Sequence, residues 1–205
     1  ETEKIIEAQL ANLTRNGVTL VPVTMADIWQ HNNAFSFTVV LYEVMRDLPD
    51  YLAEFAPDVS FKKLIEGIGS PDVTGAFSSQ LGENAIPDAV YHEAMNSHRP
   101  AMRAIYNAVF EDHALDAIVF PTTPRTASKI GEDETVQLNG KSVPTFPTFI
   151  RNTDLGSNVG APGITLPCHG NTGLPVGIEL DGLAGQDTQL LQLGKRIEKL
   201  LCTDN

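Results

Sequence analysis

The chain has 205 residues, 42% of them hydrophobic and 20% charged, which is the composition of a folded globular protein. Its formal charge is −12, because 14 lysines and arginines face 26 aspartates and glutamates. So acidic a surface repels phosphate groups and argues against nucleic acid or an anionic membrane as the main partner. The longest apolar runs also fall well short of the roughly 18 residues that a bilayer-spanning helix needs.

The two cysteines, Cys168 and Cys202, have no paired spacing. They predict neither a disulfide framework nor a zinc site, and they favour a reducing, cytoplasmic compartment. No signal peptide is recognisable at the start. The first residue is Glu1 rather than Met, so we expect a processed product or a fragment.

The first 113 residues read mainly as helices with one strand. Apolar residues recur at helical spacing in the first 15 residues, and Asn16-Gly17 is a helix-stop signal. The β-rich run that follows predicts a strand. In chain order we expect a helix over 2–15, a strand over 18–23, a helix over 26–52 broken at Pro49, short helices with loops over 53–86, and a helix over 87–111 kinked at Pro100.

The second part, from residue 114 onward, reads as core strands, long loops and a closing helix. A nearly all-apolar run is typical of a strand buried on both faces. The long connection after it is rich in Pro, Thr, Asn and Gly, so we expect it to carry function or to cover a site. The expected elements are strands over 116–120, 163–167 and 176–180, the connection over 121–162, and a helix over 187–201.

No pattern in the chain predicts a catalytic nucleophile or a metal site. His92-Glu93 lacks the second histidine that a zinc-protease helix needs four residues on, because residue 96 is Asn. No serine has the flanking glycines of a nucleophile elbow. Cys168 and His169 are neighbours, but adjacent residues on a strand point to opposite faces, which favours a buried thiol and a loop histidine.

Four ordered blocks resemble the C-terminal half of the amidase-signature family. The run Asp116-Ala-Ile-Val-Phe-Pro-Thr-Thr-Pro124 is a strand that leads into a Pro-Thr-Thr-Pro loop. The other blocks are Gly160-Ala-Pro-Gly-Ile-Thr-Leu-Pro167, Gly173-Leu-Pro-Val-Gly-Ile-Glu-Leu180 and the helix with Asp187 and Leu190-Leu191. The prolines end the strand ladders because they have no N–H to donate.

The resemblance implies an α/β fold, in which the chain forms part of a mixed twisted β-sheet sandwiched by helices, with the N-terminal half of the family pattern absent. Residues 1–205 would then be the C-terminal portion of an amidase-like domain. Within it, residues 1–113 would form a mainly helical cover with one strand. Residues 114–205 would supply core strands, pocket loops and the closing helix.

The family hydrolyses amides with a Ser–Ser–Lys triad, and it uses no metal or organic cofactor. Both the Gly-rich serine loop and the lysine belong to the N-terminal half of the family pattern, so the resemblance carries no catalytic residue onto this chain. The chain alone is expected to be inactive. Its partners would be a small amide substrate and a missing N-terminal half or companion chain; a homo-oligomer stays open.

The resemblance places five side chains in the substrate pocket. The loop after Pro121 and the stretch around residue 153 would face the acyl side of the substrate. The expected pocket residues are Thr123, Phe146, Phe149, Thr153 and Asn158. Core packing is an equally good reading for each phenylalanine. The motif also departs from the family's Asn-x-x-Gly-x-Pro, since Ser157 holds the asparagine's place and Asn158 comes one position late.

Two further readings stay open beside the amidohydrolase. The absent nucleophile is compatible with a non-catalytic binding or scaffold module derived from an amidase. A part similar to the A subunit of a tRNA-dependent amidotransferase is disfavoured, because residues 131–156 lack that subunit's Asp-x-Met-Tyr-like stretch. The same segment is more similar to small-amide hydrolases of the mandelamide or arylacetamide type.

Overall fold

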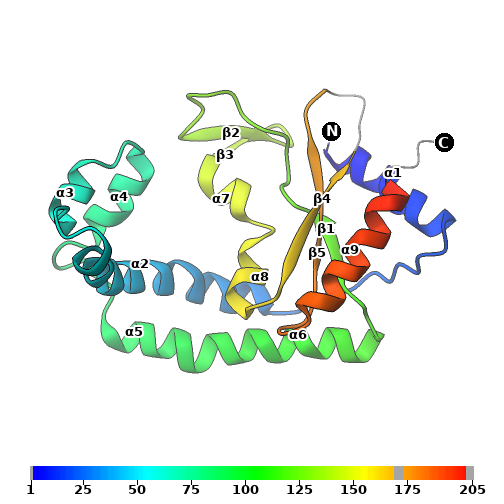
Figure 1. Cartoon of the computed structure of the whole chain (residues 1–205), viewed down its shortest axis with the longest axis horizontal. Helices are drawn as coiled ribbons and strands as arrows, with labels where there is room; N and C mark the ends of the chain where they lie inside the picture. The colour runs from blue at the N-terminus through cyan, green and yellow to red at the C-terminus, as the bar shows by residue number, and fades with distance from the viewer. Residues whose placement is uncertain (1, 169–172, 202–205) are drawn as a thin grey trace. The chain divides into compact units, whose positions relative to one another are not determined.

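A computed structural model describes residues 2–168 and 173–201 (Figure 1). The chain divides into two compact units, one of residues 1–26 with 103–205 and one of residues 27–102. Cys202 and His169 lie outside the described residues. No helix within these ranges is long and apolar enough to cross a bilayer.

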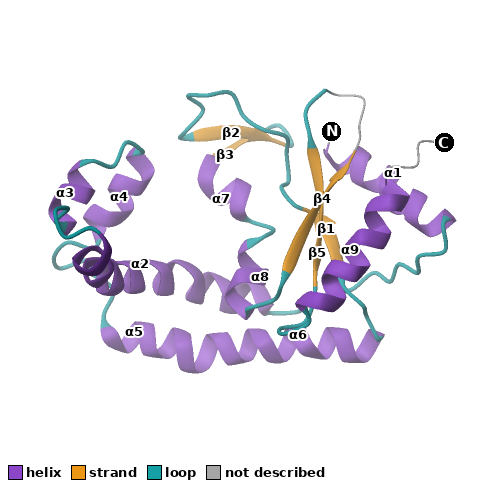
Figure 2. Cartoon of the chain, in the orientation of Figure 1, coloured by secondary structure: helices purple, strands orange, loops and turns teal. Residues whose placement is uncertain are grey.

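The first unit is built on a three-stranded antiparallel sheet in the order β1–β5–β4 (Figure 2). β1 (Ile118–Pro121) and β4 (Gly163–Cys168) flank β5 (Val176–Asp181), so that both Ile118 and Gly163 pair with Asp181. The three expected strands are therefore confirmed to within a few residues. Only Ile118 of β1 is buried, so the expectation that this strand is buried on both faces is wrong; β1 is an edge of the sheet.

The core of this unit lies between one face of the sheet and two helices. Side chains alternate along a strand, so Val176, Ile178 and Leu180 share one face of β5, and all three are buried. Apolar residues of α1 (Thr2–Arg15) and α9 (Asp187–Leu201) pack against them. The Asn12 side-chain amide also donates a 2.9 Å hydrogen bond to the Leu200 carbonyl. Both helices have the bounds that the periodicity predicts.

The expected strand over residues 18–23 is wrong. The segment has no strand assignment and no ladder partner in the described sheet. It lies beside β1, and a hollow of about 390 Å³ is lined by both. β-branched residues favour an extended backbone, but a strand also needs a neighbour that accepts and donates its hydrogen bonds.

The connection over 121–162 contains more structure than the sequence analysis expected. A hairpin joins β2 (Thr135–Leu138) to β3 (Lys141–Pro144), and α7 (Thr145–Ile150) and α8 (Asp154–Val159) follow. The hairpin turn is Asn139-Gly140, with φ angles of 51° and 76°. Two left-handed residues of this kind give the type I′ turn that matches strand twist.

The second unit packs α2 (Ile28–Phe55) against α5 (Asp88–Glu93) and the π-helical turn η1 (Ala94–His98). Two short helices, α3 (Phe61–Glu66) and α4 (Pro71–Ser79), confirm the expectation for most of 53–86. The expected break at Pro49 is wrong, because α2 continues to Phe55. A proline costs a helix one hydrogen bond, and the remaining bonds of α2 and its contacts with neighbouring helices keep the helix continuous.

The helix expected over 87–111 is present as α5, η1 and α6 (Arg99–His113). The expected kink was at Pro100, and the irregular part of the helix is instead the π-helical turn η1, which ends just before α6 begins. The ring of His98 in that turn meets His31 of α2, with 3.0 Å between the two Nδ1 atoms and 5.3 Å between the ring centroids. At this distance one ring donates its N–H to the other, and the tautomers of the two rings decide which one is the donor.

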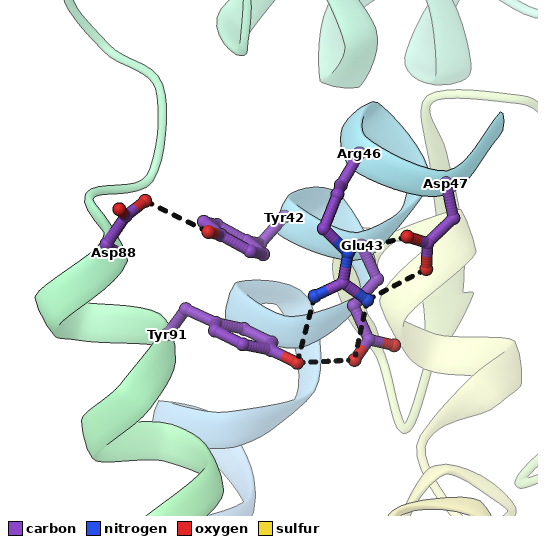
Figure 3. A network of polar contacts seen from close by, with 6 residues as sticks. All are labelled: Tyr42, Glu43, Arg46, Asp47, Asp88 and Tyr91. Carbon is purple, nitrogen blue, oxygen red and sulfur yellow. Dashed lines mark hydrogen bonds and ion pairs between the residues drawn. The ribbon is translucent and has the colours of Figure 1, made fainter. Parts of the chain in front are cut away.

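A polar network joins α2 to α5 (Figure 3). Tyr42 and Tyr91 stack with ring centroids 4.1 Å apart, and the Tyr91 hydroxyl donates to Glu43 over 2.8 Å. The Arg46 guanidinium lies over both rings and also binds Asp47. The hydrogen bond from Arg46 lowers the pKa of the Asp47 carboxyl.

Candidate functional site

The candidate site is the loop that follows β1, Pro121–Arg125. It is held on the sheet by the Thr122 amide, which donates to the Gly177 carbonyl over 3.0 Å. The Thr123 hydroxyl donates to the Arg125 carbonyl over 2.8 Å and closes a turn within the loop. This hydrogen bond within the loop holds the side chain of Thr123, one of the expected pocket residues.

A second segment reaches the same loop through Asn152, the residue before the expected pocket residue Thr153. The Asn152 side-chain amide donates to the Pro121 carbonyl over 2.7 Å. Thr153 is half-buried between α7 and α8, and its hydroxyl donates to the Ile150 carbonyl over 3.3 Å. The structure therefore joins the segment that holds Thr153 to the loop that holds Thr123, and a shared substrate pocket stays a prediction.

The two phenylalanines of α7 differ in their surroundings. Phe149 is half-buried, and the Arg125 guanidinium carbon lies 5.9 Å from the centre of its ring. The same guanidinium donates to the Gln137 carbonyl over 3.1 Å and so ties the β2–β3 hairpin to the loop. Phe146 is 46% exposed. Phe149 is joined to the loop through Arg125, and Phe146 is on the surface of the described chain.

Asn158, the last of the expected pocket residues, lies on α8 and is buried. Next to it, the Val159 carbonyl accepts a 2.9 Å hydrogen bond from Arg103 of α6, which anchors the end of the helix. A contact of Asn158 with a ligand stays a prediction.

Two carboxylates that the sequence analysis missed lie on the same face of β5, and one of them, Glu179, contacts the loop. Glu179 and Asp181 belong to β5 and are only 8% and 6% exposed. Glu179 Oε2 accepts hydrogen bonds from the Thr122 hydroxyl, over 3.0 Å, and from the Thr165 hydroxyl of β4. Burial, with a smaller contribution from Glu179, raises the pKa of the Asp181 carboxyl to about 7. The signal for this cluster was the alternation of acidic and apolar residues in a strand flanked by two others.

Glycines of the sequence motifs make room for this cluster. A β-carbon on Gly163 would lie 2.8 Å from Asp181 Oδ1 and 2.9 Å from Glu179 Oε1. A β-carbon on Gly177 would lie 2.6 Å from the Thr165 methyl and 2.7 Å from the Thr122 hydroxyl. These positions need glycine because the side chains of the cluster occupy the space.

A hollow of about 550 Å³ opens beside the loop. Its walls come from the loop, from the hairpin and from α1, and they include Pro124, Arg125, Asn139, Arg151 and Asn152. The described residues contain no group of three His, Cys, Asp or Glu side chains placed to hold a metal ion. Cys168 is buried, which raises the pKa of its thiol to about 11, so it is a poor nucleophile at neutral pH.

Comparison with known proteins identifies the family. A family model described as Amidase matches residues 1–191. The chain belongs to the amidase family. The resemblance carried by the four sequence blocks is thereby confirmed.

Relatives within the amidase family include proteins named indoleacetamide hydrolase and mandelamide hydrolase. The chain is 40% identical over 196 residues to an indoleacetamide hydrolase of Rhizobium radiobacter, covering 95% of this chain and 42% of that protein. It is 37% identical over 209 residues to the mandelamide hydrolase of Pseudomonas putida, covering 97% and 40%. The chain thus spans about two fifths of the length of these curated relatives.

Solved amidase structures have the same fold. A crystal structure of an amidase matches with a TM-score of 0.78 and 27% identity, over 97% of this chain and 42% of that one. The peptide amidase of Stenotrophomonas maltophilia matches with a TM-score of 0.60 at 24% identity, over 99% and 40%. These likenesses confirm the α/β class and the amidase-type fold expected from the sequence.

Proposed function

We propose that this chain is the C-terminal, substrate-pocket part of a serine amidohydrolase that converts a small aryl carboxamide to the acid and ammonia. The observation that carries the proposal is the similarity to indoleacetamide and mandelamide hydrolases along nearly the whole chain. In this proposal residues 1–113 are a mainly helical cover, and residues 114–205 supply the core strands and pocket loops. We also propose a cytoplasmic location, which two cysteines without paired spacing favour.

The reaction would be covalent acyl transfer. A serine oxygen attacks the amide carbonyl, the C–N bond breaks, and ammonia leaves with a proton relayed to its nitrogen. Water then attacks the acyl–serine ester, which releases the carboxylic acid and regenerates the serine. The Ser–Ser–Lys triad would lie outside residues 1–205, on the rest of the same polypeptide or on a companion chain.

Within this reaction the described residues would hold the acyl group. Thr123 and Thr153 would line the pocket from the two segments that Asn152 joins. Phe149 and Phe146 would offer apolar surface to an aryl ring, and Asn158 would complete the wall. Aryl binding in such a pocket draws on the large apolar area of a ring.

The proposal is tested by measuring ammonia release from phenylacetamide and from propionamide. The full-length protein is expected to hydrolyse the aryl amide with the higher kcat/KM, and residues 1–205 alone are expected to release no ammonia. A folded full-length protein that hydrolyses neither amide would refute the proposal in favour of a non-catalytic module. Equal kcat/KM for both amides would refute the aryl pocket.

A further inference from the structure

We propose that Glu179 is a positioning residue: its buried carboxylate holds the Pro121–Arg125 loop, through Thr122, in the conformation that receives the acyl group. The proposal rests on the proposed function, because it names what orients that pocket. Glu179 would not touch the substrate itself.

The first support is the burial of Glu179. An apolar side chain at this position would be buried at a lower cost in free energy, because it has no charge to desolvate. Glu179 sits in the middle of the central strand β5 and is 8% exposed, yet the core is made by the opposite face of that strand. No ion pair of Glu179 or Asp181 is found within the described ranges. A buried carboxylate without a cation is unfavourable unless hydrogen bonds to it compensate, so its presence needs a reason other than packing.

The second support is the choice of hydrogen-bond donors. The same oxygen, Oε2, accepts from Thr122, the second residue of the loop, and from Thr165 of the neighbouring strand β4. Hydrogen bonds to a charged acceptor are stronger than those between neutral groups. Thr122 is therefore held by hydrogen bonds at both its backbone amide and its hydroxyl. The expected pocket residue Thr123 is the next residue in the chain, so its position depends on that of Thr122.

The third support is the clearance around the cluster. Glu179 Oε1 lies against Gly163, and the hydroxyl of Thr122 lies against Gly177. Any other residue at either glycine would displace the carboxylate or the threonine that it holds. The Pro121 carbonyl is held independently by Asn152, so the loop is fastened at two successive residues.

The experiment compares Thr122→Val with Thr165→Val in the full-length enzyme. Each substitution keeps the shape of the side chain and removes one hydroxyl from the same carboxylate, but only Thr122 belongs to the loop. Thr122→Val is expected to raise KM for phenylacetamide by about fivefold to tenfold with kcat nearly unchanged, because a binding surface is displaced and the reacting groups are not. Thr165→Val is expected to leave KM within about twofold of the wild type.

The conservative variant Thr122→Ser retains the hydroxyl and is expected to restore the wild-type KM, which a general loss of packing would not do. Equal effects of the two valine variants, or no effect of either, would overturn the proposal. If Thr122→Val does not fold in the full-length enzyme, Glu179→Gln replaces it. That variant keeps an acceptor oxygen without the charge and is expected to raise KM less, by about twofold to fivefold; an unchanged KM would overturn the proposal.

A second readout does not depend on activity. Hydrogen exchange of the backbone amides of residues 122, 123, 125 and 126, measured in the full-length protein, is expected to accelerate at least about fivefold in Thr122→Val and not in Thr165→Val. A wild-type full-length protein that releases no ammonia would refute the proposed function. In that case the hydrogen-exchange measurement alone would decide whether Glu179 holds the loop. An unchanged exchange rate in Thr122→Val would show that Glu179 does not hold the loop.

Discussion

The Asp181 carboxyl makes the stability of this chain fall as the pH rises from acid to neutral. Burial raises its pKa from 3.8 to about 7, and Glu179 adds to the rise. Between these two values the folded chain keeps a proton that the unfolded chain has released. The unfolded state therefore binds fewer protons in this window, and the free energy of unfolding decreases with increasing pH.

The size of the effect follows from the same two values. A fully shielded group changes the free energy of unfolding by about 1.4 kcal/mol per pH unit, or about 4 kcal/mol over the window. Asp181 pairs with Gly163 on the edge strand β4, where Gly163 and Thr165 are exposed, so solvent screens part of its charge. We therefore expect about 1–2 kcal/mol.

The test is Asp181→Asn, which keeps the shape and removes the titrating proton. Urea unfolding is expected to show equal stability of variant and wild type near pH 4, and a gain of about 1–2 kcal/mol for the variant near pH 8. Asp112→Asn, an exposed position on α6, serves as the control and is expected to show no such divergence. Parallel stability curves for Asp181→Asn and the wild type would refute the argument that Asp181 is protonated when folded.

Two further pairs of substitutions test the packing and hydrogen bonds of the two units. Gly177→Ala is expected to destabilise the chain by about 1–3 kcal/mol in urea unfolding, because the new methyl group meets two threonine side chains. Gly75→Ala, inside α4 with open space around it, should instead stabilise the chain by about 0.5–1 kcal/mol. If both alanine variants changed the free energy of unfolding in the same direction, the difference in free space at the two glycines would not explain the result. Tyr91→Phe is expected to cost about 0.5–1.5 kcal/mol in thermal unfolding, since it removes the bond to Glu43 and keeps the ring stack. Tyr42→Phe removes a more exposed bond and should cost less; the reverse order would count against this account of the network.

Where the sequence analysis succeeded, the local pattern was sufficient. The α9 helix has a single apolar face that repeats every three to four residues, and the structure begins and ends it at the predicted residues. The strand β5 lies between Pro175 and Gly182, as expected, but the ladder of β4 continues through Pro167 to Cys168, so the expected end at that proline is wrong. The Asn139-Gly140 turn carried an equally local signal, and the hairpin was nevertheless missed.

Where it failed, the outcome depended on partners distant in sequence. Residues 18–23 have strand composition, but the described sheet gives them no neighbour to pair with. Glu179 and Asp181 fit the alternation of a half-exposed strand, whose acidic side faces water. They are buried because β5 is central and because α8 lies against that face through Gly156, which no local pattern could show.

The clearance at Gly177 has a consequence for how this part of the protein can vary. Because the threonine at 122 and the threonine at 165 both reach into the space that a β-carbon at 177 would take, the three positions form one coupled unit rather than three independent sites. A homologue with alanine at the glycine position is expected to carry serine, alanine or glycine at one of the facing threonines. Stability measurements on single substitutions would then underestimate how much the sequence of this region can change. Two substitutions that compensate each other can be tolerated where each one alone destabilises the fold.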